Sequence, residues 1–163
     1  MIGLPLVIKM NWSTFTGRVR YTTIAAKITT INNVSAFDEE SELRLEDVIA
    51  DSVRIMFRFT PNTCDCLEPK FSEEVKYLEE VIGENRVIVV ISARTYKDVL
   101  FFRERNKLSC SVIGTEETLS DEYDGTQTPY ACIVFPDMTA RHIVTIHPRN
   151  INELIDYVEK NIK

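Results

Sequence analysis

Runs of apolar residues alternate along the chain with segments of helical periodicity. Residues 53–59 are rich in β-branched and aromatic side chains and predict a strand. Residues 87–91 are apolar throughout, which is typical of a strand covered on both faces in a mainly parallel sheet. Between them, apolar residues recur every three or four positions and predict a helix from about Pro69 to Gly83. The apolar face of this helix consists of Phe71, Val75, Leu78 and Ile82.

The same alternation continues to the end of the chain. The turn-forming residues 136–139 lie between two apolar runs and predict an antiparallel hairpin. Asn150 is a suitable N-cap for a terminal helix, and Glu153 completes a capping box. The predicted elements are, in order, a helix over residues 95–104, an extended segment over 110–113, a polar acidic loop over 115–127, hairpin strands over 131–135 and 142–146, and a helix with an apolar stripe at Ile151, Leu154, Ile155, Val158 and Ile162. The whole pattern predicts an α/β fold in which helices flank a central mixed sheet.

The first part of the chain has a different pattern. Residues 4–10 and 18–31 are rich in β-branched and aromatic side chains and predict two or three strands. The acidic run over residues 38–42 reads as a solvated connection, followed by a short amphipathic helix. The apolar positions of that helix are Leu43, Leu45, Val48 and Ile49. We therefore expect one domain, with an N-terminal β extension and acidic connection over residues 1–45 and a core over residues 46–163.

Composition narrows the classes of partner. The chain has 163 residues, of which 44% are apolar and 27% charged, as expected of one globular domain. Its formal net charge of -6 opposes binding to nucleic acid or to an anionic membrane surface. The first ten residues are interrupted by Pro5 and Lys9 and resemble neither a signal peptide nor a membrane span. A periplasmic or membrane-anchored location is favoured if a leader or an upstream tether was removed, and a cytoplasmic location otherwise.

The candidate chemistry lies between the first central strand and the helix after it. Cys64 and Cys66 follow the strand over residues 53–59 and precede the helix from about Pro69. Far downstream, Thr128-Pro129-Tyr130 introduces the hairpin. This order resembles the thioredoxin-like superfamily from residue 53 to the end. It is similar in particular to its exported, membrane-tethered and Bacteroidetes-type members, which carry comparable N-terminal additions. The resemblance implies a three-layer sandwich and thiol chemistry without a cofactor.

The register of the cysteines within the family's C-x-x-C motif is open. In that family the first cysteine lies at the start of a helix, where the dipole and free N–H groups lower the thiol pKa from about 8.5. Cys64 matches this position, but the second cysteine would then fall on Leu67. Cys66 could replace it in a strained C-x-C disulfide. Alternatively, Cys66 takes the second position and Thr63 replaces the first. The family's charged residue beneath the motif and its tryptophan before the first cysteine are not evident.

The resemblance also implies a substrate edge. Thr128-Pro129 matches the cis-proline of the family, which presents backbone to a substrate thiol or peptide. We expect exchange of thiols and disulfides with a protein or peptide substrate and an unknown redox partner, with Cys64 attacking and Cys66 resolving. The expected substrate-binding residues are Pro61, Thr128, Pro129 and Tyr130. The alternative is a redox-inactive binding module that uses the groove beside Pro129.

Other chemistry-bearing residues have simpler interpretations. Cys110 and Cys132 lie in apolar extended segments and are expected to pack in the core. A copper or zinc site would need a histidine beside Cys64 and Cys66, but His142 and His147 fall on or after the hairpin, so the ligand set is incomplete. A cluster of glutamates is expected to be a solvated helix face: Glu73, Glu74, Glu79 and Glu80. Motifs of hydrolases and nucleotide-binding enzymes are absent from the sequence.

Overall fold

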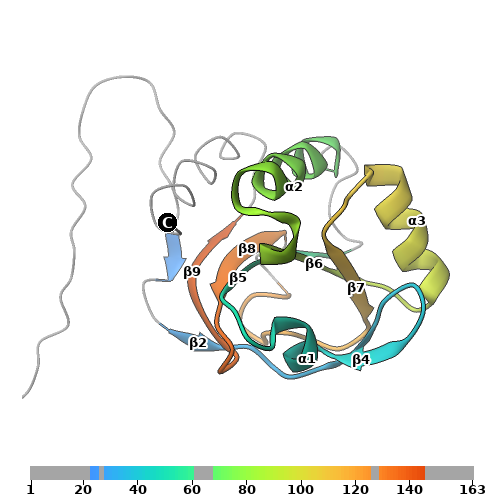
Figure 1. The fold of residues 1–163 in the computed structure, drawn as a ribbon. Coiled ribbons are helices and arrows are strands. Elements are labelled where there is room, and N and C mark those ends of the chain that lie inside the picture. Colours follow the sequence, from blue (N-terminus) through green and yellow to red (C-terminus); the bar gives the residue numbers. More distant parts are fainter. Residues whose placement is uncertain (1–22, 26–27, 61–67, 126–128, 146–163) are drawn as a thin grey trace, which may run out of the picture.

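The structure, a computed structural model, describes residues 23–25, 28–60, 68–125 and 129–145. In this part of the chain nine strands form one mixed sheet (Figure 1). Helices α2 (Glu68–Ile82) and α3 (Tyr96–Asn106) pack on one face, and α1 (Leu45–Ile49) packs on the other. The predicted three-layer α/β architecture is therefore confirmed. None of the helices described is long and apolar enough to span a membrane.

The order of the strands places the predicted central strands in the middle of the sheet. β5 pairs in parallel with β6, and β6 with β7, whereas β8 runs antiparallel to both β5 and β9. β2 also pairs with β9 but lies outside the linear order of the other eight strands. In spatial order the strands are β1 (Thr23–Ala25), β9 (Thr139–Thr145), β8 (Tyr130–Val134), β5 (Arg54–Phe59), β6 (Val87–Ser92), β7 (Ser111–Thr115), β3 (Ser35–Phe37) and β4 (Glu42–Arg44), with β2 at Thr29–Thr30.

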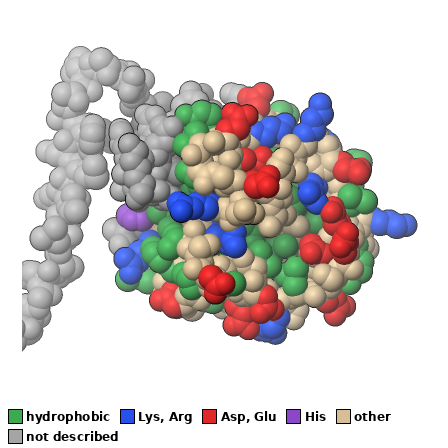
Figure 2. Space-filling model, viewed as in Figure 1, with side chains coloured by type: hydrophobic (Ala, Val, Ile, Leu, Met, Phe, Trp, Pro, Cys, Tyr) green, Lys and Arg blue, Asp and Glu red, His purple; other side chains and the backbone are tan. Residues whose placement is uncertain are grey.

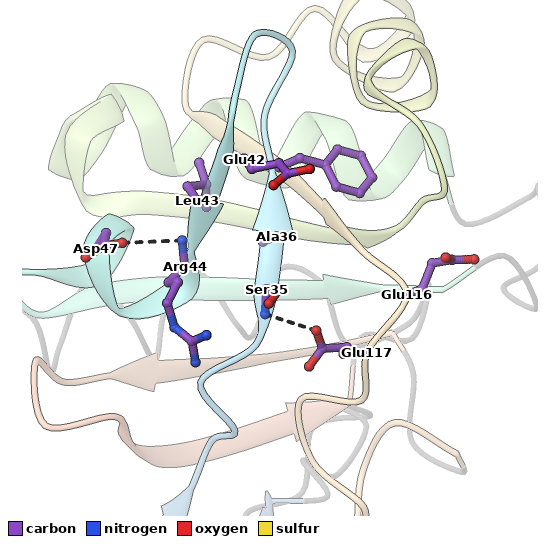
Figure 3. Close-up of a pocket in the computed structure, with 9 residues that line it drawn as sticks. Ser35, Ala36, Glu42, Leu43, Arg44, Asp47, Glu116 and Glu117 are labelled. Atoms are coloured by element: carbon purple, nitrogen blue, oxygen red, sulfur yellow. Dashed lines mark hydrogen bonds between the residues drawn. The ribbon is translucent and has the colours of Figure 1, made fainter.

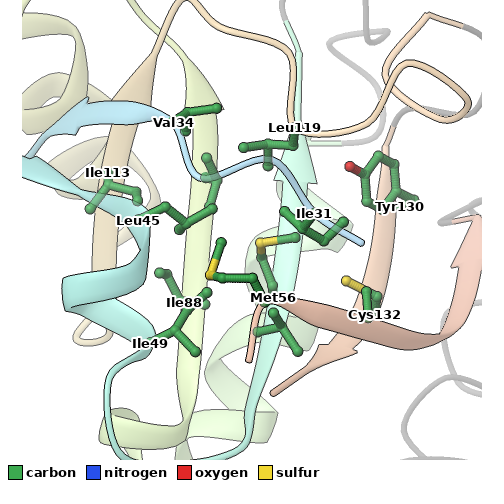
Figure 4. Close-up of a cluster of buried hydrophobic side chains, with 14 of the residues drawn as sticks. Ile31, Val34, Leu45, Ile49, Met56, Ile88, Ile113, Leu119, Tyr130 and Cys132 are labelled. Carbon is green, nitrogen blue, oxygen red and sulfur yellow. The ribbon is translucent and has the colours of Figure 1, made fainter. Parts of the chain in front are cut away.

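Each central strand is buried on both faces. Because successive side chains of a strand point to opposite faces, Phe57 and Phe59 pack against α2 and α3, while Met56 packs toward α1. The buried apolar residues form two clusters, one on each face of the sheet. The cluster that contains Met56 also contains Ile31, which precedes β3, and Leu45 of α1 (Figure 4). The apolar run that predicts a doubly covered strand thus corresponds to β6, and the prediction is confirmed.

Local signals in the sequence explain where the two long helices end and begin. Gly83, directly after α2, has a φ of 93°, a conformation that glycine adopts without steric cost. A capping box starts α3: the Thr95 hydroxyl accepts from the N–H of Asp98 at 3.3 Å, and the Asp98 carboxylate accepts from the N–H of Thr95 at 2.9 Å. A short 3-10 turn at Glu84–Arg86 joins α2 to β6.

The expectation for residues 38–45 was wrong in part. The acidic run connects two strands of a hairpin, β3 and β4, and α1 begins only at Leu45. The turn forms because one Asp38 carboxylate oxygen accepts from the N–H groups of Glu40 and Ser41 at 2.8 and 2.7 Å. Burial is the largest single influence on the pKa of Asp38 and raises it, but the hydrogen bonds together outweigh burial and hold the pKa below its usual value. The division of the chain at residue 45 stays a prediction.

The glutamates of α2 are not all solvated, so that expectation was also wrong in part. Glu73 and Glu80 are exposed, whereas Glu74 is buried. One oxygen of Glu79 accepts from the N–H groups of Ser109 and Cys110 at 3.0 and 2.7 Å, and so ties α2 to the start of β7. Charges of both signs are interspersed over the face of the molecule in Figure 2.

Candidate functional site

The candidate thiol segment joins β5 to α2. Residues 61–67, with Pro61, Cys64 and Cys66, lie outside the described residues, as does Thr128. Their arrangement, including the predicted cis-proline, stays a prediction. The described residues define the strands that lead into these segments.

β5 and β8 are direct neighbours at this end of the sheet. Arg58, two residues before Thr60, pairs with Tyr130 in the antiparallel ladder. The strand that precedes residues 61–67 and the strand that follows residues 126–128 are therefore neighbours in the sheet.

Pro129 and Tyr130 are both buried. The Tyr130 hydroxyl donates to Asp124 at 2.8 Å, and burial, followed by the nearby Asp124 carboxylate, raises the pKa of Tyr130. The phenol therefore stays protonated and remains a donor. The Tyr130 side chain is therefore engaged within the protein, and its backbone is paired with β5 and β9.

A buried ion pair lies beside Tyr130. Arg58 Nη2 is 3.1 Å from Asp124 Oδ2, and the two side chains are 3% and 8% exposed. Arg58 Nε donates to the same oxygen at 3.2 Å, and the N–H of Leu119 donates to it at 2.9 Å. Because a buried charge without a partner is costly, the carboxylate and guanidinium require one another in this interior.

Arg58 also reaches two further segments. Its Nη2 donates to the Ser92 hydroxyl at 3.2 Å and to the backbone oxygen of Glu117 at 3.3 Å. Ser92 ends β6, Glu117 follows β7, and Tyr130 begins β8. One guanidinium thus joins, directly or through Asp124, the ends of four strands around the candidate site.

The described part of the expected polar, acidic loop over residues 115–127 also contributes to the interior. In this segment Leu119, Ser120 and Tyr123 are buried, and Asp124 holds Arg58. Sequence reasoning missed the buried charge, although an arginine within the apolar run of residues 53–59 was the available signal. Glu116 and Glu122 are exposed, as expected of a polar loop, while the buried residues anchor the loop in the interior.

The thiols that the structure describes are buried. Cys110 and Cys132 are free cysteines with almost no exposure, which confirms their predicted place in the core. Burial is the main cause that raises the pKa of Cys110, and it raises the pKa of Cys132 to about 12, with a contribution from Asp124. Both stay protonated near neutral pH and are poor nucleophiles.

A hollow opens at the carboxyl ends of β5 and β6. It has a volume of about 530 Å³, and its apolar wall includes Phe59 and Phe101. Phe101 is 63% exposed, which is unusual for an aromatic side chain. The Arg94–Glu116 ion pair, at 3.2 Å, stands at the rim. The hollow could receive an apolar side chain at the end of β5.

A second hollow of about 610 Å³ lies against the β3–β4 hairpin (Figure 3). In its wall the Ser35 N–H donates to the Glu117 carboxylate at 3.2 Å, and the Arg44 N–H donates to Asp47 at 3.4 Å. Glu117 therefore links the β3–β4 hairpin to Arg58: its carboxylate accepts from Ser35, and its backbone oxygen accepts from Arg58. Part of the polar wall is therefore already engaged in internal hydrogen bonds.

His142 lies on β9 and is exposed. Partial burial, and then the Arg141 charge, lower the pKa of His142. The described residues contain no group of three metal-ligating side chains. His147, Cys64 and Cys66 lie outside those residues, so the metal hypothesis stays untested.

Comparison with known proteins identifies the fold. No family model and no curated protein matches the sequence. A protein from Chlorobium tepidum assigned as the thiol:disulfide interchange protein DsbE superposes with a TM-score of 0.64 at 10% identity, covering 82% of this chain and 96% of its own. A secreted Mycobacterium tuberculosis disulfide oxidoreductase homologous to E. coli DsbE gives 0.54 at 12% identity, with coverages of 78% and 96%. Xylella fastidiosa PrxQ gives 0.55 at 8% identity, with coverages of 85% and 100%. The chain has the thioredoxin-like fold.

Proposed function

We propose that this protein exchanges thiols and disulfides with a protein or peptide substrate through Cys64 and Cys66. The observation that carries the proposal is the position of both cysteines, in the connection from β5 to α2 of a thioredoxin-like fold. A thiol near the start of a helix is favoured as thiolate by the dipole and the free N–H groups. Because fold alone does not establish activity, the proposal depends on these two side chains.

In the proposed reaction the Cys64 thiolate attacks one sulfur of a substrate disulfide. The substrate S–S bond breaks, a mixed disulfide forms, and the first substrate sulfur leaves as a thiolate that takes a proton from water. The Cys66 thiolate then attacks the Cys64 sulfur and releases the second substrate thiolate. The substrate gains two electrons, and the protein is left with a Cys64–Cys66 disulfide. An external dithiol reverses this oxidation; in the opposite direction the protein oxidises a substrate dithiol.

We propose that the substrate binds along the backbone of Thr128-Pro129-Tyr130, opposite Pro61. The pairing of Arg58 with Tyr130 supports this, because it makes the two connecting segments leave from adjacent strands. The exposed Phe101 and the hollow beside Phe59 offer an apolar surface for residues that flank the substrate cysteine.

The test is reduction of a synthetic peptide disulfide by the dithiothreitol-reduced protein, with Cys64→Ser, Cys66→Ser and Cys132→Ala variants in parallel. We expect Cys64→Ser to abolish exchange, Cys66→Ser to trap a mixed disulfide, and Cys132→Ala to leave the rate within about twofold, because Cys132 is buried and protonated. Equal rates in all four proteins, or no exchange by the wild type, would overturn the proposal and favour the redox-inactive binding module.

A further inference from the structure

We infer that the buried network of Arg58, Asp124 and Tyr130 positions the substrate edge for this exchange, and that Tyr130 is a positioning residue for the reaction. The inference rests on the proposed function. In this inference the network aligns Pro129 and Tyr130 with the end of β5. It has no part in the reactivity of the thiol itself.

Every link of the network is a short contact between buried groups. The Asp124 carboxylate uses both oxygens: Oδ2 accepts from Arg58 and from the Leu119 N–H, and Oδ1 accepts from the Tyr130 hydroxyl at 2.8 Å. Hydrogen bonds to an ionised partner are stronger and more directional than neutral ones. The position of the first residue of β8 is therefore tied to a fixed charge on β5.

A stabilising role alone explains the network poorly. Replacing a buried ion pair by apolar side chains of similar volume is often neutral or stabilising. This interior already contains two large apolar clusters, one of which includes Tyr123 and Tyr130. Apolar packing is not directional, whereas the Arg58 guanidinium holds four strand ends in fixed positions through its contacts with Ser92, Glu117 and Asp124.

Tyr123 provides a matched control for Tyr130. Both rings are buried and lie against each other, with centroids 6.0 Å apart at an angle of 62°. The Tyr130 hydroxyl donates to Asp124, whereas the Tyr123 hydroxyl is buried with no hydrogen-bond partner among the described residues. Substitution by phenylalanine removes one oxygen from the same environment in both, but removes a link of the network only at residue 130.

The experiment compares Tyr130→Phe and Tyr123→Phe with the wild type in two assays. The first is steady-state reduction of the peptide disulfide, and the second is alkylation of Cys64 by iodoacetamide between pH 5 and pH 9, followed by mass spectrometry. We expect Tyr130→Phe to raise the KM for the peptide about fivefold or more, as loss of a hydrogen bond to a charged group can do, and Tyr123→Phe to change it by less than about twofold. Both variants should keep the wild-type pH profile of alkylation.

A second variant separates position from charge. Arg58→Lys keeps a positive charge but cannot bond Ser92, Glu117 and Asp124 together. If it unfolds, Tyr130→Phe, which removes a single oxygen, still decides the question. We expect Arg58→Lys also to raise KM while leaving the alkylation profile in place.

The outcomes separate this inference from the proposed function. An active wild type with equal KM values for Tyr130→Phe and Tyr123→Phe would overturn the inference alone. A shift of the Cys64 alkylation profile in Tyr130→Phe would also overturn it, because the network would then act on the thiol. A wild type that does not exchange disulfides would overturn the proposed function and this inference with it.

Discussion

Arg58 on β5 and Asp124 on the segment before β8 lie 3.1 Å apart in the interior, although 66 residues separate them in the sequence. The contact ties the carboxyl end of β5, which precedes the candidate thiol segment, to the segment that leads into β8. It also explains how an acidic, polar loop is anchored: Asp124 has its counter-ion in the interior, and Leu119 and Tyr123 are buried in the same apolar cluster as Tyr130.

Removing one partner of this ion pair should strongly destabilise the protein. Arg58→Met leaves the Asp124 carboxylate buried without its counter-ion, which we expect to cost about 3–5 kcal/mol in the free energy of unfolding. The double variant Arg58→Met/Asp124→Leu should recover most of this loss because it leaves no buried charge. Urea unfolding at neutral pH measures both. A single variant as stable as the wild type would show that water reaches the site and that the pair is not desolvated.

Glu79 should contribute to stability, whereas its neighbour Glu80 should not. Glu79→Ala leaves the N–H groups of Ser109 and Cys110 without their acceptor, a loss of about 1–3 kcal/mol. Glu80 is exposed, and Glu80→Ala should change stability by less than about 0.5 kcal/mol. Thermal unfolding of the two variants side by side is sufficient. Similar melting temperatures would contradict the contact between α2 and the start of β7.

Alkaline pH should destabilise the protein through its buried thiols. The pKa of Cys132 is raised from 9.0 to about 12 by burial and by Asp124, so the folded protein retains this proton at a pH where the unfolded chain releases it. The contribution of this protonated thiol to the free energy of unfolding is therefore fully present below the pKa of the unfolded chain, about 8.5. Above that pH it falls by up to about 1.4 kcal/mol per pH unit.

Cys132→Ala isolates the contribution of that thiol. The variant should be less stable than the wild type near pH 8 because it leaves a cavity, but its stability should fall less steeply toward pH 10. Chemical unfolding at intervals of half a pH unit gives both slopes. Parallel curves for the two proteins would contradict a strongly raised pKa at Cys132.

Local patterns in the sequence were sufficient to predict the elements that form the core. The apolar runs and the three-to-four-residue periodicity have the spacings of β5, β6 and α2, and the turn residues 136–139 identify the β8–β9 hairpin. Such signals lie within a few residues of each other, so they can be read without tertiary contacts.

Other features depend on contacts that no local pattern contains. β3 and β4 have three residues each, with charged residues at both ends of β4, and they become strands because β3 pairs with β7. Similarly, Arg58 and Asp124 look like ordinary charged residues until the fold brings them together. The sequence predicted the place of the cysteines in the topology, but their exchange activity depends on side chains outside the described residues.

The central claim is that Cys64 and Cys66 form a reversible disulfide. The most direct test is equilibration of the protein in dithiothreitol buffers of graded redox poise, followed by acid quenching, alkylation and mass spectrometry of the peptide that contains both cysteines. The account predicts one two-electron transition in which Cys64 and Cys66 are protected together, while Cys110 and Cys132 stay reduced. Four thiols that remain reduced under every buffer would contradict it.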